Sequence, residues 1–241
     1  IKLQSLSNFS DFDPLETEPT VKLRWVEGND SIGKPDIVII PGSKQTIKDL
    51  NQLFENGLAE QIKTFSKNGG QVFGICGGLQ MMGMILEDPN HLEGNEKQHP
   101  RKIIKGLGIL PIKTIFKESK TVRQRNIKSC WPAEIEVNGF ELHHGESKLM
   151  INENSRLRNL FADGSLGWIV EEGNHKGALA TYIHGIFDNG KWRRTWLNSI
   201  RAKKGLTNLR TNIKDHREQR ERVINLLADS FSEHIDLSKV L

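Results

Sequence analysis

The sequence predicts an α/β fold: an open, mainly parallel sheet flanked by helices, with antiparallel hairpins added to it. Two short apolar runs, residues 37–40 and 71–75, are bounded by Pro or Gly, as is typical of buried parallel strands. A helical pattern follows each run, so strand and helix alternate along the first half of the chain. The second half instead carries apolar segments paired around Gly-containing turns, which indicates hairpins.

Three helices are expected in the first half. Ser43 is a candidate N-cap for the helix after the first strand, and a second helix covers residues 58–66. The second strand leads directly into a third helix, which carries Leu79, Met82 and Ile85 on one side. This order of elements favours a parallel sheet.

The middle of the chain is more irregular. Residues 88–105 are expected to form a long loop, residues 107–116 a strand, and residues 117–130 an exposed loop or a ragged strand. Asn138-Gly139 follows an alternating segment and precedes another, which predicts a tight hairpin centred on these two residues.

A second hairpin is predicted from residues 166–171 and 178–183, which flank a Gly-bounded turn. Helices are expected over residues 191–204 and 212–233. We expect residues 1–205 to form one domain and residues 206–241 to form a helical segment packed on it.

Composition excludes several classes of protein. The 241 residues include 27% charged and 36% hydrophobic residues, as in an ordinary soluble globular protein, and no apolar run is long enough to span a bilayer. The net charge of +4 comes without the aromatic or recognition motifs of nucleic-acid binding. No signal peptide is evident, and two cysteines are too few for a disulfide framework, which favours a reducing, cytoplasmic setting. The start at Ile1 suggests a piece of a longer chain.

Residues 74–78 (Gly-Ile-Cys-Gly-Gly) have the form of a nucleophile elbow with Cys76 as the nucleophile. A tight strand-to-helix turn places the thiol at a helix N-terminus, where the helix dipole favours the thiolate. The N–H of Gly77 can face a developing oxyanion. The alternative is a structural cysteine beside a Gly-rich turn. Cys130 lacks such a setting and is interpreted as an incidental thiol.

A thiolate nucleophile needs a base, usually histidine. His184 ends an apolar run, which places it at the carboxyl end of a strand, where α/β sheets keep their sites. His143 and His144 end the first predicted hairpin, and either could touch a substrate or cap a sheet edge. Gly42 follows the first strand, where its small size would let the backbone approach a ligand.

These residues resemble a known family. Residues 74–80 resemble the G-x-C-x-G-x-Q elbow of class I (triad-type) glutamine amidotransferases, which have a flavodoxin-like fold. More narrowly, the chain resembles the C-terminal glutaminase domains of the cobyric acid synthase family over about residues 5–205. The segments that carry this resemblance are residues 7–13, 41–46, 74–83, 106–111, 139–143 and 182–189.

The resemblance implies a reaction. Cys76 would attack the side-chain amide of glutamine, and His184 would act as base and then as acid toward ammonia. Gly42 and Gly77 would supply oxyanion N–H groups. The substrate-binding residues would be Gly42, Ser43, Gly77, Gln80 and His144.

The resemblance also implies a partner. Ammonia would pass to an N-terminal synthetase domain, absent from this chain, which uses ATP and Mg²⁺ to amidate a corrinoid, adenosylcobyrinic acid a,c-diamide, in cobalamin biosynthesis. No cofactor or metal is expected in the glutaminase domain itself. Nucleic acid and membrane are not expected partners.

One departure from the wider class concerns the base. Many class I enzymes have H-x-E, whose carboxylate orients the imidazole, but position 186 here is Ile186. Glu141 and Asp188 are candidates for the orienting group. Leu79 stands where relatives often carry a polar or aromatic residue and is expected to modify the pocket.

Two other functions remain open at this point. The same elbow could serve cobyrinic acid a,c-diamide synthase or a cell-wall lipid II amidating enzyme, whose glutaminase domains are similar. A non-catalytic binding domain on this fold is the alternative from another class.

Overall fold

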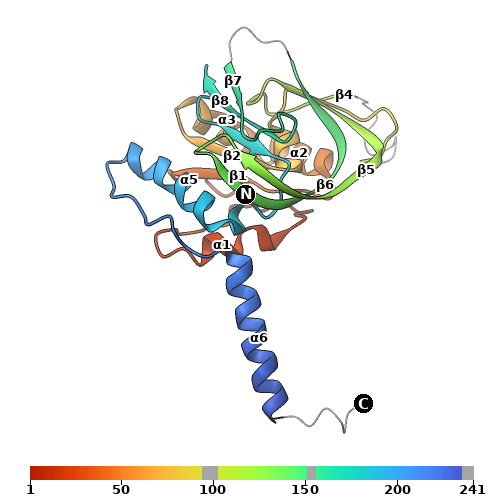
Figure 1. Ribbon diagram of the computed structural model, residues 1–241. Helices are drawn as coiled ribbons and strands as arrows, with labels where there is room; N and C mark the ends of the chain where they lie inside the picture. The colour runs from red at the N-terminus through yellow and green to blue at the C-terminus, as the bar shows by residue number, and fades with distance from the viewer. Residues whose placement is uncertain (94–102, 151–155, 235–241) are drawn as a thin grey trace.

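The protein is described by a computed structural model over residues 1–93, 103–150 and 156–234. A five-stranded sheet runs through its centre in the order β1-β2-β9-β8-β7 (Figure 1). The first three strands are parallel, and β8 and β7 are antiparallel to their neighbours, which confirms the predicted α/β class with an added hairpin. The strands are β1 (Ile37–Ile40), β2 (Gln71–Ile75), β9 (Leu179–Thr181), β8 (Gly167–Glu172) and β7 (Arg156–Asn159).

Helices cover both faces of this sheet. Successive side chains of a strand point to opposite faces, so the apolar strand β2 contributes to a core on each side. Val72 of β2 joins the apolar cluster under α2 (Thr46–Glu55) and α3 (Leu58–Lys67). The next residue, Phe73, packs in the other cluster, with its ring centroid 5.6 Å from that of Trp196 in α5 (Gly190–Lys203). The three helices begin and end within a few residues of their predicted bounds.

A second, four-stranded sheet extends from the first in the order β4-β3-β5-β6. Two of its strands, β5 and β6, form long curved antiparallel arms (Figure 1). The prediction of a loop or ragged strand over residues 117–130 is therefore wrong as regards the loop, because β5 runs through most of that segment. The strands are β3 (Ile85–Glu87), β4 (Ile103–Lys105), β5 (Ile112–Ser129) and β6 (Ile135–Leu149).

The hairpin predicted at Asn138-Gly139 is also wrong. Both residues lie inside β6, paired with Asn126 and Arg125 of β5. Gly139 meets a different demand from that of a turn, because a side chain there would put its Cβ 2.5 Å from the carbonyl oxygen of His184. Glycine permits this close backbone approach.

Short helices connect the larger elements, and their bounds correct two predictions. α4 ends at Met82, so Ile85 belongs to β3 and not to that helix. α2 begins at Thr46 with Gln45 at its N-cap position, so Ser43 does not cap it. The short helices are η1 (Phe9–Asp11), α1 (Asp13–Glu16), α4 (Gly77–Met82) and η2 (Ile186–Asp188).

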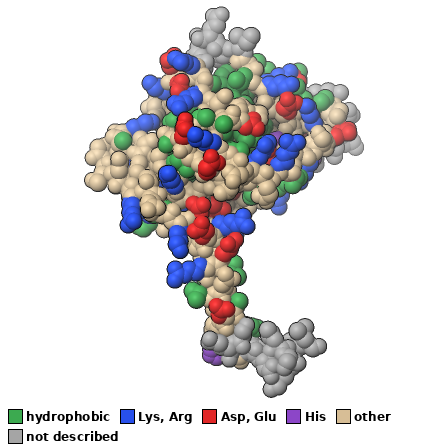
Figure 2. All heavy atoms as spheres, in the orientation of Figure 1, with side chains coloured by type: hydrophobic (Ala, Val, Ile, Leu, Met, Phe, Trp, Pro, Cys, Tyr) green, Lys and Arg blue, Asp and Glu red, His purple; other side chains and the backbone are tan. Residues whose placement is uncertain are grey.

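The C-terminal segment only partly packs on the domain. Its first part does so: the Gly190 N–H donates to Asp215 at 2.7 Å. From His216, however, helix α6 (His216–His234) extends away from the body (Figure 1). Hydrophobic side chains are visible along it in Figure 2, and Leu227 is 65% exposed. The predicted helix is therefore present as α6. The prediction that it packs on the domain is wrong for most of its length.

Two predictions fall partly outside the described residues. Of the loop predicted over residues 88–105, residues 94–102 lie outside, and β4 takes up its end. Residues 235–241 of the C-terminal segment also lie outside. Among the helices that the structure describes, none combines the length and apolar character needed to cross a membrane.

Candidate active site

Cys76 lies in a strained turn between β2 and α4. Its backbone angles are φ 51° and ψ −107°, an uncommon region for any residue other than glycine. Gly78 lets the turn close, since a side chain there would place its Cβ 2.0 Å from the carbonyl oxygen of Ile40. Strain of this kind costs of order 1–3 kcal/mol and is typical of functional sites. The predicted elbow is present, with the thiol at the N-terminal end of α4.

His184 lies beside this thiol. It follows β9, the strand parallel to β2, so the two residues leave the same edge of the sheet. The His184 side chain is 2% exposed, and its interaction with Cys76 is one of the causes that raise its pKa. Its ring also stacks on Phe140 of β6, with centroids 5.1 Å apart. The structure therefore brings together the two residues predicted as nucleophile and base.

The other ring nitrogen of His184 contacts a carboxylate. Its Nδ1 lies 2.7 Å from Oδ2 of Asp11, in η1 near the start of the chain. Burial lowers the pKa of His184, but the hydrogen bonds and charges of Asp11 and Cys76 outweigh burial and raise it to about 10. The environment thus favours the imidazolium form at neutral pH.

Asp11 occupies the place for which the sequence offered Glu141 and Asp188. Glu141 pairs instead with Arg125 and His143, and no described hydrogen bond joins Asp188 to the His184 ring. The expectation for both is corrected. Sequence reasoning missed Asp11, although it stands in the segment 7–13 that carried part of the family resemblance.

Gly42 and Ser43 lie on the loop after β1, next to the elbow. A side chain on Gly42 would put its Cβ 3.0 Å from Cε1 of His184, and one on Gly77 would lie 2.8 Å from the Ser43 nitrogen. The Ser43 hydroxyl donates to buried Asp49 at 2.6 Å. The loop thus borders the elbow at Gly77 and the ring of His184, and its role as a second oxyanion donor stays a prediction.

Comparison with known proteins gives this arrangement a family. Residues 1–192 match the CobB/CobQ-like glutamine amidotransferase domain. The chain belongs to this family of amidotransferase domains.

Individual relatives agree with this assignment. Over its full length the chain is 50% identical to a cobyric acid synthase of Prochlorococcus marinus (strain MIT 9313), of which it covers 48%. It is 46% identical to one of Synechococcus sp. (strain WH7803), of which it covers 49%. The chain therefore spans about half the length of these curated relatives.

Solved structures support the fold of the amidotransferase domain. A crystal structure of a glutamine amidotransferase superposes with a TM-score of 0.57 at 13% identity, over 85% of this chain and 97% of that one. PurLQS from Thermotoga maritima gives 0.52 at 14% identity, over 79% and 92% of the two chains. At these identities the likeness concerns the fold alone.

Gln80 of the amidotransferase domain is buried beside the elbow. Its side-chain N–H group donates to the carbonyl oxygen of His144 at 2.8 Å and lies 3.4 Å from the Tyr182 hydroxyl. Its carbonyl oxygen accepts from the Thr46 hydroxyl at 3.4 Å. These contacts tie α4 to β6 and to α2, and direct binding of substrate by Gln80 stays a prediction.

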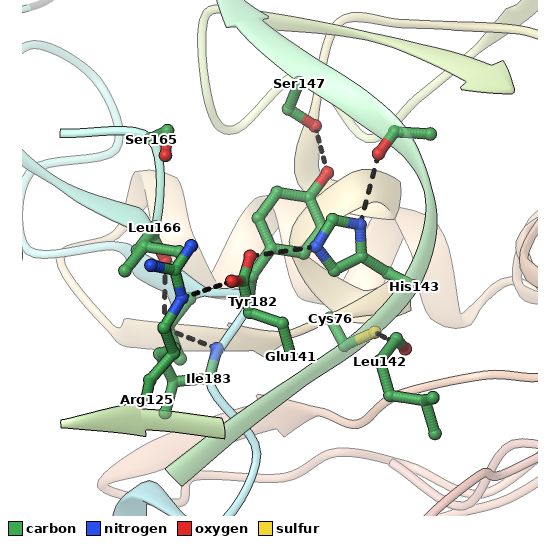
Figure 3. Close-up of polar contacts among 12 residues, drawn as sticks. Cys76, Arg125, Glu141, Leu142, His143, Ser147, Ser165, Leu166, Tyr182 and Ile183 are labelled. Carbon is green, nitrogen blue, oxygen red and sulfur yellow. Dashed lines mark hydrogen bonds and ion pairs between the residues drawn. The ribbon is translucent and has the colours of Figure 1, made fainter. Parts of the chain in front are cut away.

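Tyr182, a neighbour of Gln80, also contacts a polar network around His143 of β6 (Figure 3). The ring of His143 stacks on that of Tyr182, with centroids 3.9 Å apart. Its Nε2 lies 3.2 Å from Oε2 of Glu141, and the Glu141 carboxylate also pairs with Arg125. Burial raises the pKa of Glu141, but hydrogen bonds from His143 and Arg125 lower it below its usual range. A carboxylate with these partners is held in its charged form.

The two adjacent histidines of β6 differ in role. The His143 side chain belongs to the buried network. The His144 ring lies 3.3 Å from the Lys117 carbonyl at an exposed contact, and it is the main-chain oxygen of His144 that meets Gln80. Whether either touches a substrate stays a prediction.

Two further features bear on the chemistry. Within residues 1–93, 103–150 and 156–234, no group of three or more His, Cys, Asp or Glu side chains is arranged to hold a metal ion. Cys76 and Cys130 are both free thiols. Cys76 is 4% exposed, and its Sγ lies 3.4 Å from the Leu142 carbonyl oxygen of β6 (Figure 3).

Proposed function

We propose that this domain hydrolyses glutamine to glutamate and ammonia, with Cys76 as nucleophile and His184 as base and acid. The observation that carries the proposal is the contact of a strained, elbow-borne thiol with a buried histidine. Family membership adds that the nitrogen donor is glutamine.

The first half of the reaction forms a thioester. The Cys76 thiolate attacks the side-chain carbonyl carbon of glutamine, and the oxygen becomes an oxyanion. In this proposal the oxyanion accepts hydrogen bonds from the N–H of Gly77, at the start of α4, and from the backbone of the Gly42-Ser43 loop; the closeness of that loop to the elbow supports this role. Imidazolium His184 then gives its proton to the departing nitrogen, and ammonia leaves.

The second half regenerates the thiolate. Neutral His184 takes a proton from water, which attacks the γ-glutamyl thioester. The C–S bond breaks, glutamate leaves, and the thiolate–imidazolium pair is restored. Because the nucleophile must be a free thiol, we expect the domain to work in a reducing compartment, the cytoplasm.

For the whole protein we propose cobyric acid synthase. The relatives of that name are 43–50% identical and about twice as long as this chain. The remaining part would be an ATP- and Mg²⁺-dependent synthetase domain that uses the ammonia to amidate adenosylcobyrinic acid a,c-diamide in cobalamin biosynthesis.

The test is Cys76→Ala in the natural full-length protein, with Cys130→Ala as the matched control. Cys76→Ala should abolish glutamine hydrolysis and glutamine-dependent amidation but leave ammonia-supported amidation intact. Cys130→Ala should leave all three activities at the wild-type level. Glutamine hydrolysis that survives in Cys76→Ala would contradict the proposal, and amidation of a different corrinoid or of lipid II would contradict the acceptor.

A further inference from the structure

The N-terminal segment of residues 5–11, here called the N-terminal strap, touches two parts of the candidate site that are far from it in sequence. It forms a short antiparallel bridge between Leu6 and Ser43. Through it, the Ser7 N–H donates to the Gly42 carbonyl at 3.0 Å, and the Lys44 N–H donates to the Ser5 carbonyl at 2.8 Å. The strap thereby fixes the loop beside the thiol.

At its other end the strap presents a buried carboxylate to His184. Asp11 is 4% exposed and lies 173 positions from the histidine. Its Oδ2 faces Nδ1 of His184 at 2.7 Å, while its Oδ1 accepts from the Gly185 N–H at 2.9 Å and from the Asn8 side chain at 2.8 Å. Both oxygens are therefore satisfied, and the carboxylate is fixed relative to the backbone of Gly185, the residue that follows His184.

We infer that Asp11 is the positioning residue of this site: it holds His184 with Nδ1 protonated and Nε2 directed at Cys76. The inference rests on the proposed function. An ionised carboxylate only accepts hydrogen bonds, so the proton between the two groups belongs to Nδ1. With Nδ1 engaged, Nε2 is the ring nitrogen left for the thiol.

This assignment explains how the site works without a carboxylate at position 186. Ile186 is 1% exposed and packs in the apolar cluster around Phe187, where a carboxylate would be desolvated. The orienting charge comes instead from Asp11 of the strap. The same strap therefore holds both the loop after β1 and the ring of His184. The contacts of the strap with the domain thus support both.

Asp11→Asn in the full-length protein tests the inference. An amide can donate to Nδ1 and so favour the Nε2–H tautomer, which cannot accept the thiol proton. We expect glutaminase kcat to fall roughly 10²–10⁴-fold, with a much smaller change in KM. Loss of the adjacent anion also lowers the pKa of His184, so the alkaline limb of the kcat/KM profile should move to lower pH.

Two variants separate positioning from mere structural support. Asp11→Glu keeps the charge and should recover part of the activity and an alkaline limb close to that of the wild type. Asp188→Asn removes a nearby acid that does not contact the ring, and we expect activity within about threefold of wild type. Asp11→Asn at near-wild-type rate with an unmoved alkaline limb would overturn the inference. Survival of activity in Cys76→Ala would instead overturn the proposed function, so the two failures are distinguishable.

A measurement on the unmutated protein covers the case in which Asp11→Asn does not fold. Long-range ¹H–¹⁵N spectra of the histidine rings should show His184 with a proton on Nδ1 at neutral pH, in slow exchange with water. His184→Asn identifies the signal by its loss. An Nδ1 without a proton would contradict the assignment directly.

Discussion

The two halves of the candidate site are assembled in different ways. The elbow that carries Cys76 is built from neighbours in sequence, with β2, the turn and α4 spanning residues 71–82. The surroundings of His184 are collected from distant segments: Asp11 comes from the strap, Phe140 from β6 and Gly42 from the loop after β1. The nucleophile is thus positioned by local backbone geometry and the base by tertiary contacts.

This difference has a consequence for robustness. Local strain at Cys76 is maintained by β2 and by α4, which are buried in the centre of the domain. The orientation of His184 depends on a strap that joins the domain through a few hydrogen bonds. We therefore expect changes in the strap to affect proton transfer more than folding, and changes in the elbow to affect both.

The largest effect is expected on the side of the base. His184→Asn keeps a polar group of similar size but removes the proton carrier, so glutaminase activity should fall roughly 10⁴-fold or more. Steady-state glutamate release measures this. Circular dichroism should show an unchanged fold, because asparagine is smaller than histidine and needs no rearrangement of the buried surroundings. Activity within about tenfold of wild type would remove His184 from the mechanism.

The elbow can be broken by a single methyl group. Gly78→Ala would place a Cβ 2.0 Å from the Ile40 carbonyl oxygen, and the backbone on both sides cannot easily move. We expect a loss of about 1–3 kcal/mol in the free energy of unfolding together with loss of activity. Urea denaturation measures the first quantity. The control is Gly57→Ala, where no atom lies within 4 Å but a φ of 78° imposes strain of its own; it should leave the activity of the folded protein intact.

The pH dependence of kcat/KM tests whether His184 is charged beside Cys76. With the pKa of His184 raised to about 10, the imidazolium persists through neutral pH and is lost only as the pH rises through that value. The kcat/KM for glutamine should therefore hold to about pH 9 and then fall tenfold per pH unit. A descending limb centred near the ordinary histidine pKa of about 6.5 would contradict the charged pair.

The smallest effect is expected in the part of α6 that extends away from the body of the domain. Leu227 is 65% exposed, so Leu227→Ala removes little buried surface. The free energy of unfolding should change by less than about 0.5 kcal/mol, and glutaminase kcat should be unaffected. A larger loss of stability in the full-length protein would mean that another surface covers this helix.

The sequence could predict what depends on local pattern. The apolar runs of β1 and β2, the helices α2, α3 and α5, and the pairing of β8 with β9 all follow from short-range periodicity and Gly or Pro boundaries. Cys76 and His184 could be chosen because each stands at the carboxyl end of such a run. Their approach to each other then follows from the parallel arrangement of β2 and β9.

What depends on distant contacts could not be predicted. Asn138-Gly139 has the local signature of a turn. In the structure, however, the absence of a side chain at Gly139 lets the backbone of His184 pack against β6. Asp11 had no neighbour in sequence that marked it as a partner of the histidine. The apolar residues of α6 fit a packed helix, but periodicity does not say whether a surface is present to receive it.

The most direct test of the central claim is covalent labelling by a glutamine-analogue electrophile, mapped by mass spectrometry in the full-length protein. We predict one adduct, on Cys76, that forms at least about 100-fold more slowly in His184→Asn because the thiolate loses its imidazolium partner. Cys130 should stay unlabelled as an internal control. Absence of an adduct on Cys76, or labelling at the same rate in both proteins, would contradict the account.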